Sequence, residues 1–110
     1  EGVYEMLSAP LHTRPFRPAP VPQATMLELY QAEDCPYSQS VRETMQELGL
    51  SFVAHNPRTH DGAERNSQTL AELEAVGGQD QIPFLVDHAT ETTMYESGDI
   101  VDYLESEYGD

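Results

Sequence analysis

The spacing of hydrophobic and polar positions changes several times along residues 26–110, and each change predicts a different element. Residues 26–30 alternate between apolar and polar side chains, which is typical of a half-buried strand. Further along, Val41, Met45 and Leu48 recur at i, i+4 and i+7, the spacing of one face of an amphipathic helix. The chain is therefore expected to pass from strand to helix between residues 31 and 36.

The same analysis predicts four strands and three helices. We expect strands at roughly 26–31, 51–55, 84–86 and 92–95. Helices are expected at roughly 36–48, from a cap at residue 66 or 67 until the two glycines at 77–78, and after residue 97. Val76 is expected to face inward beside Leu70 and Leu73, and Ser97 to cap the last helix. The order βαβαββα predicts an α/β fold with a four-stranded mixed sheet and helices on both faces.

Composition separates the first 25 residues from the rest. Residues 1–25 hold five of the eight prolines, and two Glu balance two Arg. The net charge of −15 therefore lies in residues 26–110, which contain three Arg, eighteen acids and no Lys. We expect residues 1–25 to form a Pro-rich, disordered N-terminal arm, and residues 26–110 to form one domain.

The acidic balance also restricts the partners. Nucleic acids and anionic membrane surfaces attract basic proteins, so neither is expected to bind a chain with this charge. No run of about 18 apolar residues is present to span a membrane. Dense carboxylates are typical of a salt-adapted protein, and a single cysteine does not imply an oxidising compartment. We therefore expect a cytoplasmic, halophilic protein.

The only cysteine, Cys35, lies at the predicted junction of the first strand and first helix. Pro36 suits the first helical position, which places Cys35 at or beside the N-cap. There the unpaired amides and the positive end of the helix dipole favour a thiolate, the nucleophilic form of cysteine. The alternative is a small buried hydrophobe, as most free cysteines are.

Three segments, in this element order, resemble those of a known family. Cys35-Pro36-Tyr37-Ser38 is similar to the Cys-Pro-Tyr-Cys motif of glutaredoxins, with the second cysteine replaced. Residues 81–84 are similar to the family's cis-proline segment, and residues 95–100 to the helix start that holds the glutamyl end of glutathione. Residues 26–110 thus resemble the thioredoxin fold, and within it the glutaredoxins and the N-terminal domains of glutathione transferases.

The resemblance implies a role for particular residues. Cys35 would be the catalytic nucleophile within a motif that includes Pro36 and Ser38, and Ser38 cannot act as a resolving thiol. The residues that the resemblance implies for glutathione binding are Tyr37, Arg58, Ile82, Pro83, Glu96 and Ser97. A helix start is also a natural carboxylate site, and the neighbouring acid would meet the ammonium group of a γ-glutamyl ligand.

Several of these assignments have alternatives. Glu96 is one more solvated acid in the simplest interpretation, and Arg42 and Asn56 compete with Arg58 for the ligand's second carboxylate. Many glutaredoxins carry a cation shortly before the cysteine, whereas residues 33 and 34 of this chain are acids that oppose a thiolate. The histidines His55, His60 and His88 show no ligand spacing and are expected at the surface rather than on a metal.

These features favour a monothiol, glutaredoxin-like oxidoreductase without a bound cofactor. It would act as a monomer and reduce mixed disulfides between proteins and glutathione or another γ-glutamyl thiol. The alternative is a dimeric carrier of a [2Fe–2S] cluster, held by one Cys35 from each subunit and two small thiols. A third hypothesis, a transferase domain cut from a longer protein, is less favoured because the chain ends soon after a complete helix.

Overall fold

The computed structural model describes residues 26–110, and the predicted arm at residues 1–25 lies outside the described residues. Seven elements follow one another in the predicted order: β1 (Leu27–Tyr30), α1 (Pro36–Glu47), β2 (Val53–His55), α2 (Ser67–Gly77), β3 (Phe84–Asp87), β4 (Thr92–Tyr95) and α3 (Ser97–Tyr108). Within these residues, the helices are too short and too polar to cross a membrane.

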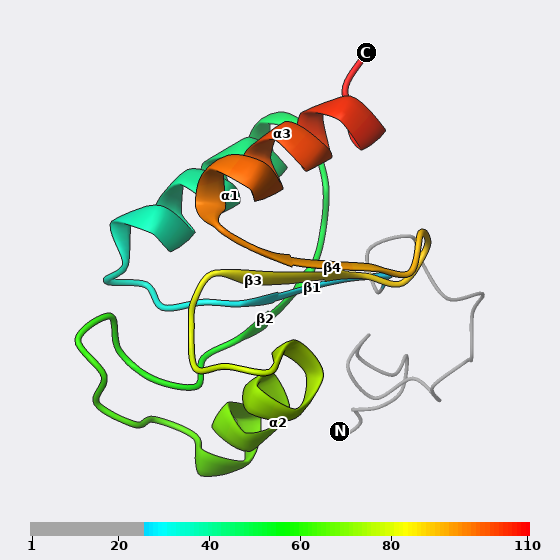
Figure 1. The fold of residues 1–110 in the computed structure, drawn as a ribbon. Coiled ribbons are helices and arrows are strands. Elements are labelled where there is room, and N and C mark those ends of the chain that lie inside the picture. The colour runs from blue at the N-terminus through cyan, green and yellow to red at the C-terminus, as the bar shows by residue number, and fades with distance from the viewer. Residues whose placement is uncertain (1–25) are drawn as a thin grey trace, which may run out of the picture.

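The four strands form one mixed sheet in the order β2-β1-β3-β4. Strand β1 pairs with β2 in parallel and with β3 in antiparallel orientation, and β3 pairs with β4 as an antiparallel hairpin. Helices α1 and α3 cover one face of the sheet, and α2 lies on the other (Figure 1). The α/β fold predicted from the pattern and the thioredoxin-like architecture implied by the resemblance are therefore confirmed.

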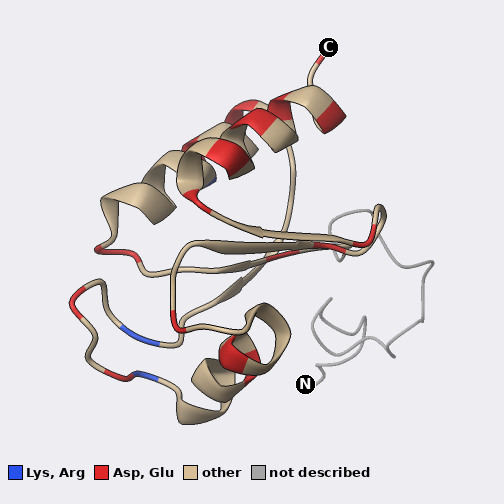
Figure 2. Ribbon diagram, viewed as in Figure 1, with Lys and Arg blue, Asp and Glu red and all other residues tan. Residues whose placement is uncertain are grey.

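Charge is distributed unevenly over this framework. Acidic residues are spread over all three helices, whereas two of the three described arginines, Arg58 and Arg65, lie in the loop between β2 and α2 (Figure 2). The third, Arg42, belongs to α1.

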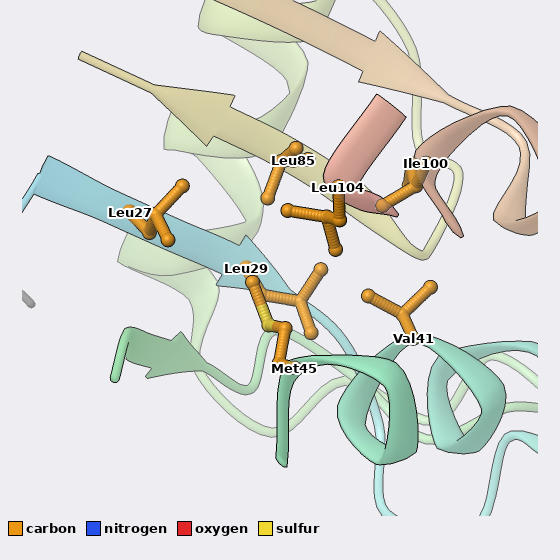
Figure 3. Packing of buried hydrophobic residues seen from close by; sticks show 7 residues of the cluster. All are labelled: Leu27, Leu29, Val41, Met45, Leu85, Ile100 and Leu104. Atoms are coloured by element: carbon orange, nitrogen blue, oxygen red, sulfur yellow. The ribbon is translucent and has the colours of Figure 1, made fainter. Parts of the chain in front are cut away.

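The larger core lies between the sheet and the α1–α3 layer (Figure 3). Its buried members come from two strands and two helices: Leu27, Leu29, Val41, Met45, Leu85, Ile100 and Leu104. A second cluster on the other face combines Tyr30, Phe84 and Val86 of the sheet with Leu73 of α2. Both faces of the central strands are thus apolar, which is why helices pack on both sides.

Two local predictions are wrong. Val76 is 53% exposed, because Gly77 rather than Val76 lies in line with Leu70 and Leu73 and meets the sheet. A Cβ atom at Gly77 would stand 2.0 Å from the Tyr95 hydroxyl oxygen, so only glycine fits this approach.

The second correction concerns the start of α3. The N-cap is Glu96, not Ser97, and its side chain makes no capping hydrogen bond. Only Glu96 separates β4 from α3, so the chain changes direction at this single residue. Its backbone φ is 74°, a value that residues other than glycine rarely adopt.

A fully buried carboxylate ties the end of β3 to α3. Asp87 accepts hydrogen bonds from the hydroxyls of Tyr103 and Tyr108, each at 2.6 Å, and from the backbone N–H of Ala89 at 3.0 Å. These bonds hold the C-terminal half of α3 against the sheet.

We predict that Asp87→Ala lowers the free energy of unfolding by about 1–3 kcal/mol, because it leaves two tyrosine hydroxyls without their acceptor. Tyr108→Phe should cost about 1 kcal/mol, since only one bond is lost. Urea unfolding measures both, with Tyr37→Phe at an exposed position as the control. Equal stability of Asp87→Ala and the native chain would contradict this role.

The same tyrosines predict an alkaline limit to stability. Burial, followed by the hydrogen bond to Asp87, raises the pKa of Tyr103 and of Tyr108 above the ordinary value of about 10. Above that pH the unfolded chain loses protons that the folded chain keeps, so this contribution is fully present below pH 10 and declines above it. Melting temperatures between pH 8 and 12 should show the decline, and Tyr108→Phe should make it shallower. An equally steep decline in that variant would refute the assignment.

Candidate functional site

The first part of the site is the start of α1, which forms as its sequence predicts. Cys35 is the N-cap, and its sulfur accepts the backbone N–H of Ser38 at 3.4 Å. Pro36 occupies the first turn. The buried Ser38 hydroxyl accepts the N–H of Ala32 at 3.3 Å, so this side chain closes the turn that carries the cysteine.

The thiol is buried, as the alternative interpretation of Cys35 expected, and the structure shows which segments bury it. Cys35 is only 1% exposed, and it belongs to the apolar cluster that includes Ile82, Phe84 and Leu73. An N-cap follows from neighbouring residues, whereas this burial comes from α2 and the segment before β3. The thiol therefore lies beneath the surface of the site.

Next to this cluster lies a cavity of about 350 Å³. Eight residues line it: Tyr37, Arg58, His60, Gln81, Ile82, Pro83, Glu96 and Ser97. The structure thus brings together all six residues implied for glutathione binding, although Cys35 itself is not in the lining. The Ile82–Pro83 peptide bond is cis, as the resemblance implied.

One wall of the cavity is the start of α3. Because no side chain caps this helix, its first backbone N–H groups remain available at the cavity. The Glu96 carboxylate lies beside them and accepts a hydrogen bond from the Gln81 amide at 2.8 Å. A helix start next to an acid is suited to a ligand with adjacent carboxylate and ammonium groups.

Arg58 supplies the cation of the cavity. Its Nε atom lies 2.6 Å from Asp80, and its Nη1 atom donates to the carbonyls of Thr59 and His60 at 2.8 and 3.1 Å. The guanidinium group is therefore held in one orientation by the surrounding chain.

The two competing candidates for the second carboxylate do not reach this cavity. Arg42 donates to the side chain of the buried Gln31 at 2.5 Å and to the carbonyl of Ala32 at 3.2 Å. Asn56 accepts from the same Gln31 amide. Arg42 and Asn56 instead stabilise the loop that precedes Cys35 through their hydrogen bonds to Gln31 and Ala32. The only sign of this role in the sequence is the glutamine that directly follows the first strand.

The two acids before Cys35 have partners of their own. Asp34 accepts the backbone N–H of His60 at 2.9 Å, and Glu33 lies 3.6 Å from the Nε atom of Arg42. A second, more open cavity of about 400 Å³ adjoins them. Its lining consists of Ala32, Glu33, Asp34, Asn56, Arg58, Thr59 and Arg65.

His60 and Gln81 are cavity residues that sequence analysis missed. His60 is exposed, as expected of a surface histidine, but its ring lies 6.2 Å from that of Tyr37, and both residues line the cavity. A single histidine in a polar loop and a glutamine before a proline carry no spacing signal. Only the loop's folded position reveals them.

The other two histidines within residues 26–110 contact one carboxylate. His55 and His88 both contact Glu28, the former at 2.7 Å. Burial raises the pKa of Glu28, but the hydrogen bonds from both histidines outweigh it and hold the pKa below its usual value. Across residues 26–110, no three His, Cys, Asp or Glu side chains are grouped so that they could hold a metal ion.

Comparison with known proteins places this site in context. The family model described as glutathione S-transferase, N-terminal domain, matches residues 29–110. This is the second of the two families that the sequence motifs resemble. A search of curated proteins found no significant match.

Solved glutathione transferases share the fold. URE2P6 of Phanerochaete chrysosporium in complex with oxidized glutathione is 27% identical, with a TM-score of 0.61 over 76% of this chain and 36% of its own. A diazinon-metabolizing transferase of the silkworm Bombyx mori is 26% identical, with a TM-score of 0.61 over 76% of this chain and 38% of its own. The chain therefore spans less than two fifths of these relatives.

Proposed function

This chain belongs to the glutathione S-transferase N-terminal domain family, and from that membership we propose a glutathione-dependent thiol-disulfide oxidoreductase of the monothiol type. One observation carries the proposal. The cis-proline segment, the uncapped start of α3 and the anchored Arg58 line a single cavity beside the cluster that contains Cys35.

Each end of a γ-glutamyl thiol then has a partner in this cavity. The glutamyl carboxylate binds the N–H groups at Ser97, and its ammonium group binds Glu96. The second carboxylate pairs with Arg58. The peptide backbone of the ligand pairs with Ile82 as an added strand, with Tyr37 beside the sulfur.

The reaction is thiol–disulfide exchange at Cys35. The Cys35 thiolate attacks the sulfur of the small thiol in a mixed disulfide, and the bond from that sulfur to the target protein breaks. The target leaves as a thiolate and takes up a proton. A second small thiolate then attacks the new disulfide, which regenerates Cys35 and releases the disulfide of two small thiols. Because Cys35 is buried, the packed side chains, Ile82 among them, must move aside before the attack.

The monothiol assignment follows from position 38. Ser38 has no sulfur, and its hydroxyl is already engaged with the backbone of Ala32. Resolution therefore falls to a second small thiol. Glutathionylated proteins are the proposed substrates, and the proposed active form is a cytoplasmic monomer.

The cluster-carrying alternative fits the geometry less well. A cluster shared by two copies needs both Cys35 sulfurs at the surface, whereas this side chain is 1% exposed and packed among apolar residues. A small thiol can approach Cys35 from the adjoining cavity, so only the side chains between that cavity and the sulfur must move. Protein purified without oxygen should therefore be colourless, and the visible absorption of an iron–sulfur cluster would reverse this preference.

Conjugation of glutathione to an electrophile is the second candidate, favoured by the family that matches residues 29–110. In that reaction the residue at the start of α1 only stabilises the glutathione thiolate by a hydrogen bond. A serine hydroxyl can make such a bond, so a substitution at Cys35 separates the two reactions.

We predict that Cys35→Ser abolishes reduction of a glutathione mixed disulfide, because no other described residue can form the covalent intermediate. Turnover of a mixed-disulfide peptide measures the loss, and Ser51→Ala, at an exposed position outside both cavities, is the control that keeps the thiol. Residual exchange above the uncatalysed rate would disprove the oxidoreductase. Retained conjugation of a chloronitrobenzene without exchange would identify a transferase.

Salt adaptation is the second expectation to be tested. Residues 26–110 carry three arginines against eighteen acids, so the folded chain repels itself in dilute buffer. The Debye length falls from about 10 Å at 0.1 M salt to about 3 Å at 1 M, which screens this repulsion. The melting temperature should rise between 0.1 M and 2 M potassium chloride. A flat or falling value would rule out salt adaptation.

A further inference from the structure

The loop between β2 and α2 is a self-contained wall shared by the two cavities. The N–H groups of Arg65 and Asn66 donate to the carbonyl of Pro57, and the backbones of Arg58 and Glu64 form an isolated antiparallel β-bridge. At the tip, the segment 59–63 is closed by hydrogen bonds from Thr59 N to Ala63 O at 2.8 Å and from Gly62 N to Thr59 O at 3.1 Å. These internal bonds connect the tip to the base of the loop, so a bond from the tip to another segment positions the loop.

Asp34 provides that attachment. The Asp34 carboxylate accepts a hydrogen bond from the backbone N–H of His60 at 2.9 Å. The backbone carbonyl of His60 in turn accepts one from the Arg58 guanidinium at 3.1 Å. In the part of the chain that the structure describes, no other hydrogen bond joins the tip 59–63 to residues 31–38, which lead into α1. The rings of Tyr37 and His60, whose centroids are 6.2 Å apart, form a second contact between the tip and the start of α1.

The position of this bond gives it a role in ligand binding. His60 lines the first cavity, Asp34 lines the second, and Arg58 lines both. The bond from His60 to Asp34 therefore joins the loop that lines both cavities to the segment that leads into α1.

We propose that Asp34 is a positioning residue for the small thiol, acting as a hydrogen-bond acceptor rather than through its charge. This inference rests on the proposed function, because it concerns the cavity assigned there to glutathione. It also reverses the expectation from sequence, in which Asp34 merely opposed a thiolate at Cys35. If the negative charge of Asp34 mainly repels the anionic ligand, removing the side chain should strengthen binding. If its hydrogen bond to His60 mainly holds the loop in place, removing the side chain should weaken binding.

Asparagine separates the acceptor from the charge. Asp34→Asn keeps an oxygen for the His60 N–H and removes the charge, whereas Asp34→Ala removes both. Glu33→Gln is the matched control, because it neutralises the adjacent acid and leaves the attachment intact. S-methylglutathione is the probe, since it cannot react with Cys35, and calorimetry on the full chain gives its Kd.

The expected result is a Kd about three- to tenfold higher in Asp34→Ala, the loss typical of one hydrogen bond. Asp34→Asn and Glu33→Gln should bind within twofold of the native chain or more tightly. In steady-state reduction of a mixed disulfide, Asp34→Ala should raise KM for glutathione by the same factor at an unchanged kcat. Equal shifts in Asp34→Ala and Asp34→Asn, or native affinity in Asp34→Ala, would overturn the positioning role while leaving the proposed function standing.

Two further measurements keep the outcomes separate. A native chain that fails to bind S-methylglutathione would overturn the proposed function, and this inference with it. Amide exchange at His60 tests the bond without a ligand and without relying on a foldable alanine variant. Protection in both the native chain and Asp34→Asn supports the acceptor role, and an unprotected His60 amide in the native chain overturns it.

Discussion

One row of paired residues across the sheet determines where the site lies. Tyr30 of β1 stands opposite His55 of β2 on one side and Phe84 of β3 on the other, and Phe84 stands opposite Tyr95 of β4. Each of these residues is the terminal residue of its strand, and a segment of the candidate site adjoins it directly in the sequence. The register of the sheet therefore brings four segments, distant in sequence, to the same edge.

Those four segments supply the whole candidate site. The turn with Cys35 follows β1, the loop with Arg58 and His60 follows β2, the Ile82–Pro83 peptide precedes β3, and Glu96 follows β4. A one-residue shift in any pairing would turn the strand's apolar side chains to the wrong face, so the cores on both sides of the sheet maintain the register. Packing of the core and geometry of the site thus depend on the same alternation.

Polar contacts then hold the site segments at this edge of the sheet in fixed positions. Gln31 is a buried residue of the loop that precedes Cys35, and its side chain connects Arg42 of α1 to Asn56 after β2. Together with Asp34, it ties the start of α1 to the loop that carries the cations of the cavities. In a chain with so few basic residues, all three described arginines hold or line this end of the molecule, where an anionic ligand is expected.

Local sequence was sufficient for the elements and for much of the site. Alternation and helical spacing predicted the seven elements, and Pro36 beside the only cysteine predicted the N-cap. The resemblance of three short segments identified six residues that the fold brings to one cavity. Such features depend on neighbouring residues or on motifs, so they are readable along the chain.

Long-range packing decided the rest. The burial of Cys35, the inward place of Gly77 instead of Val76 and the hydrogen bond from His60 to Asp34 each join segments far apart in sequence. Glu96 became the N-cap of α3 because the hairpin register left one residue between β4 and the helix. None of these has a periodic signature, because each depends on distances that exist only after the sheet and helices have packed.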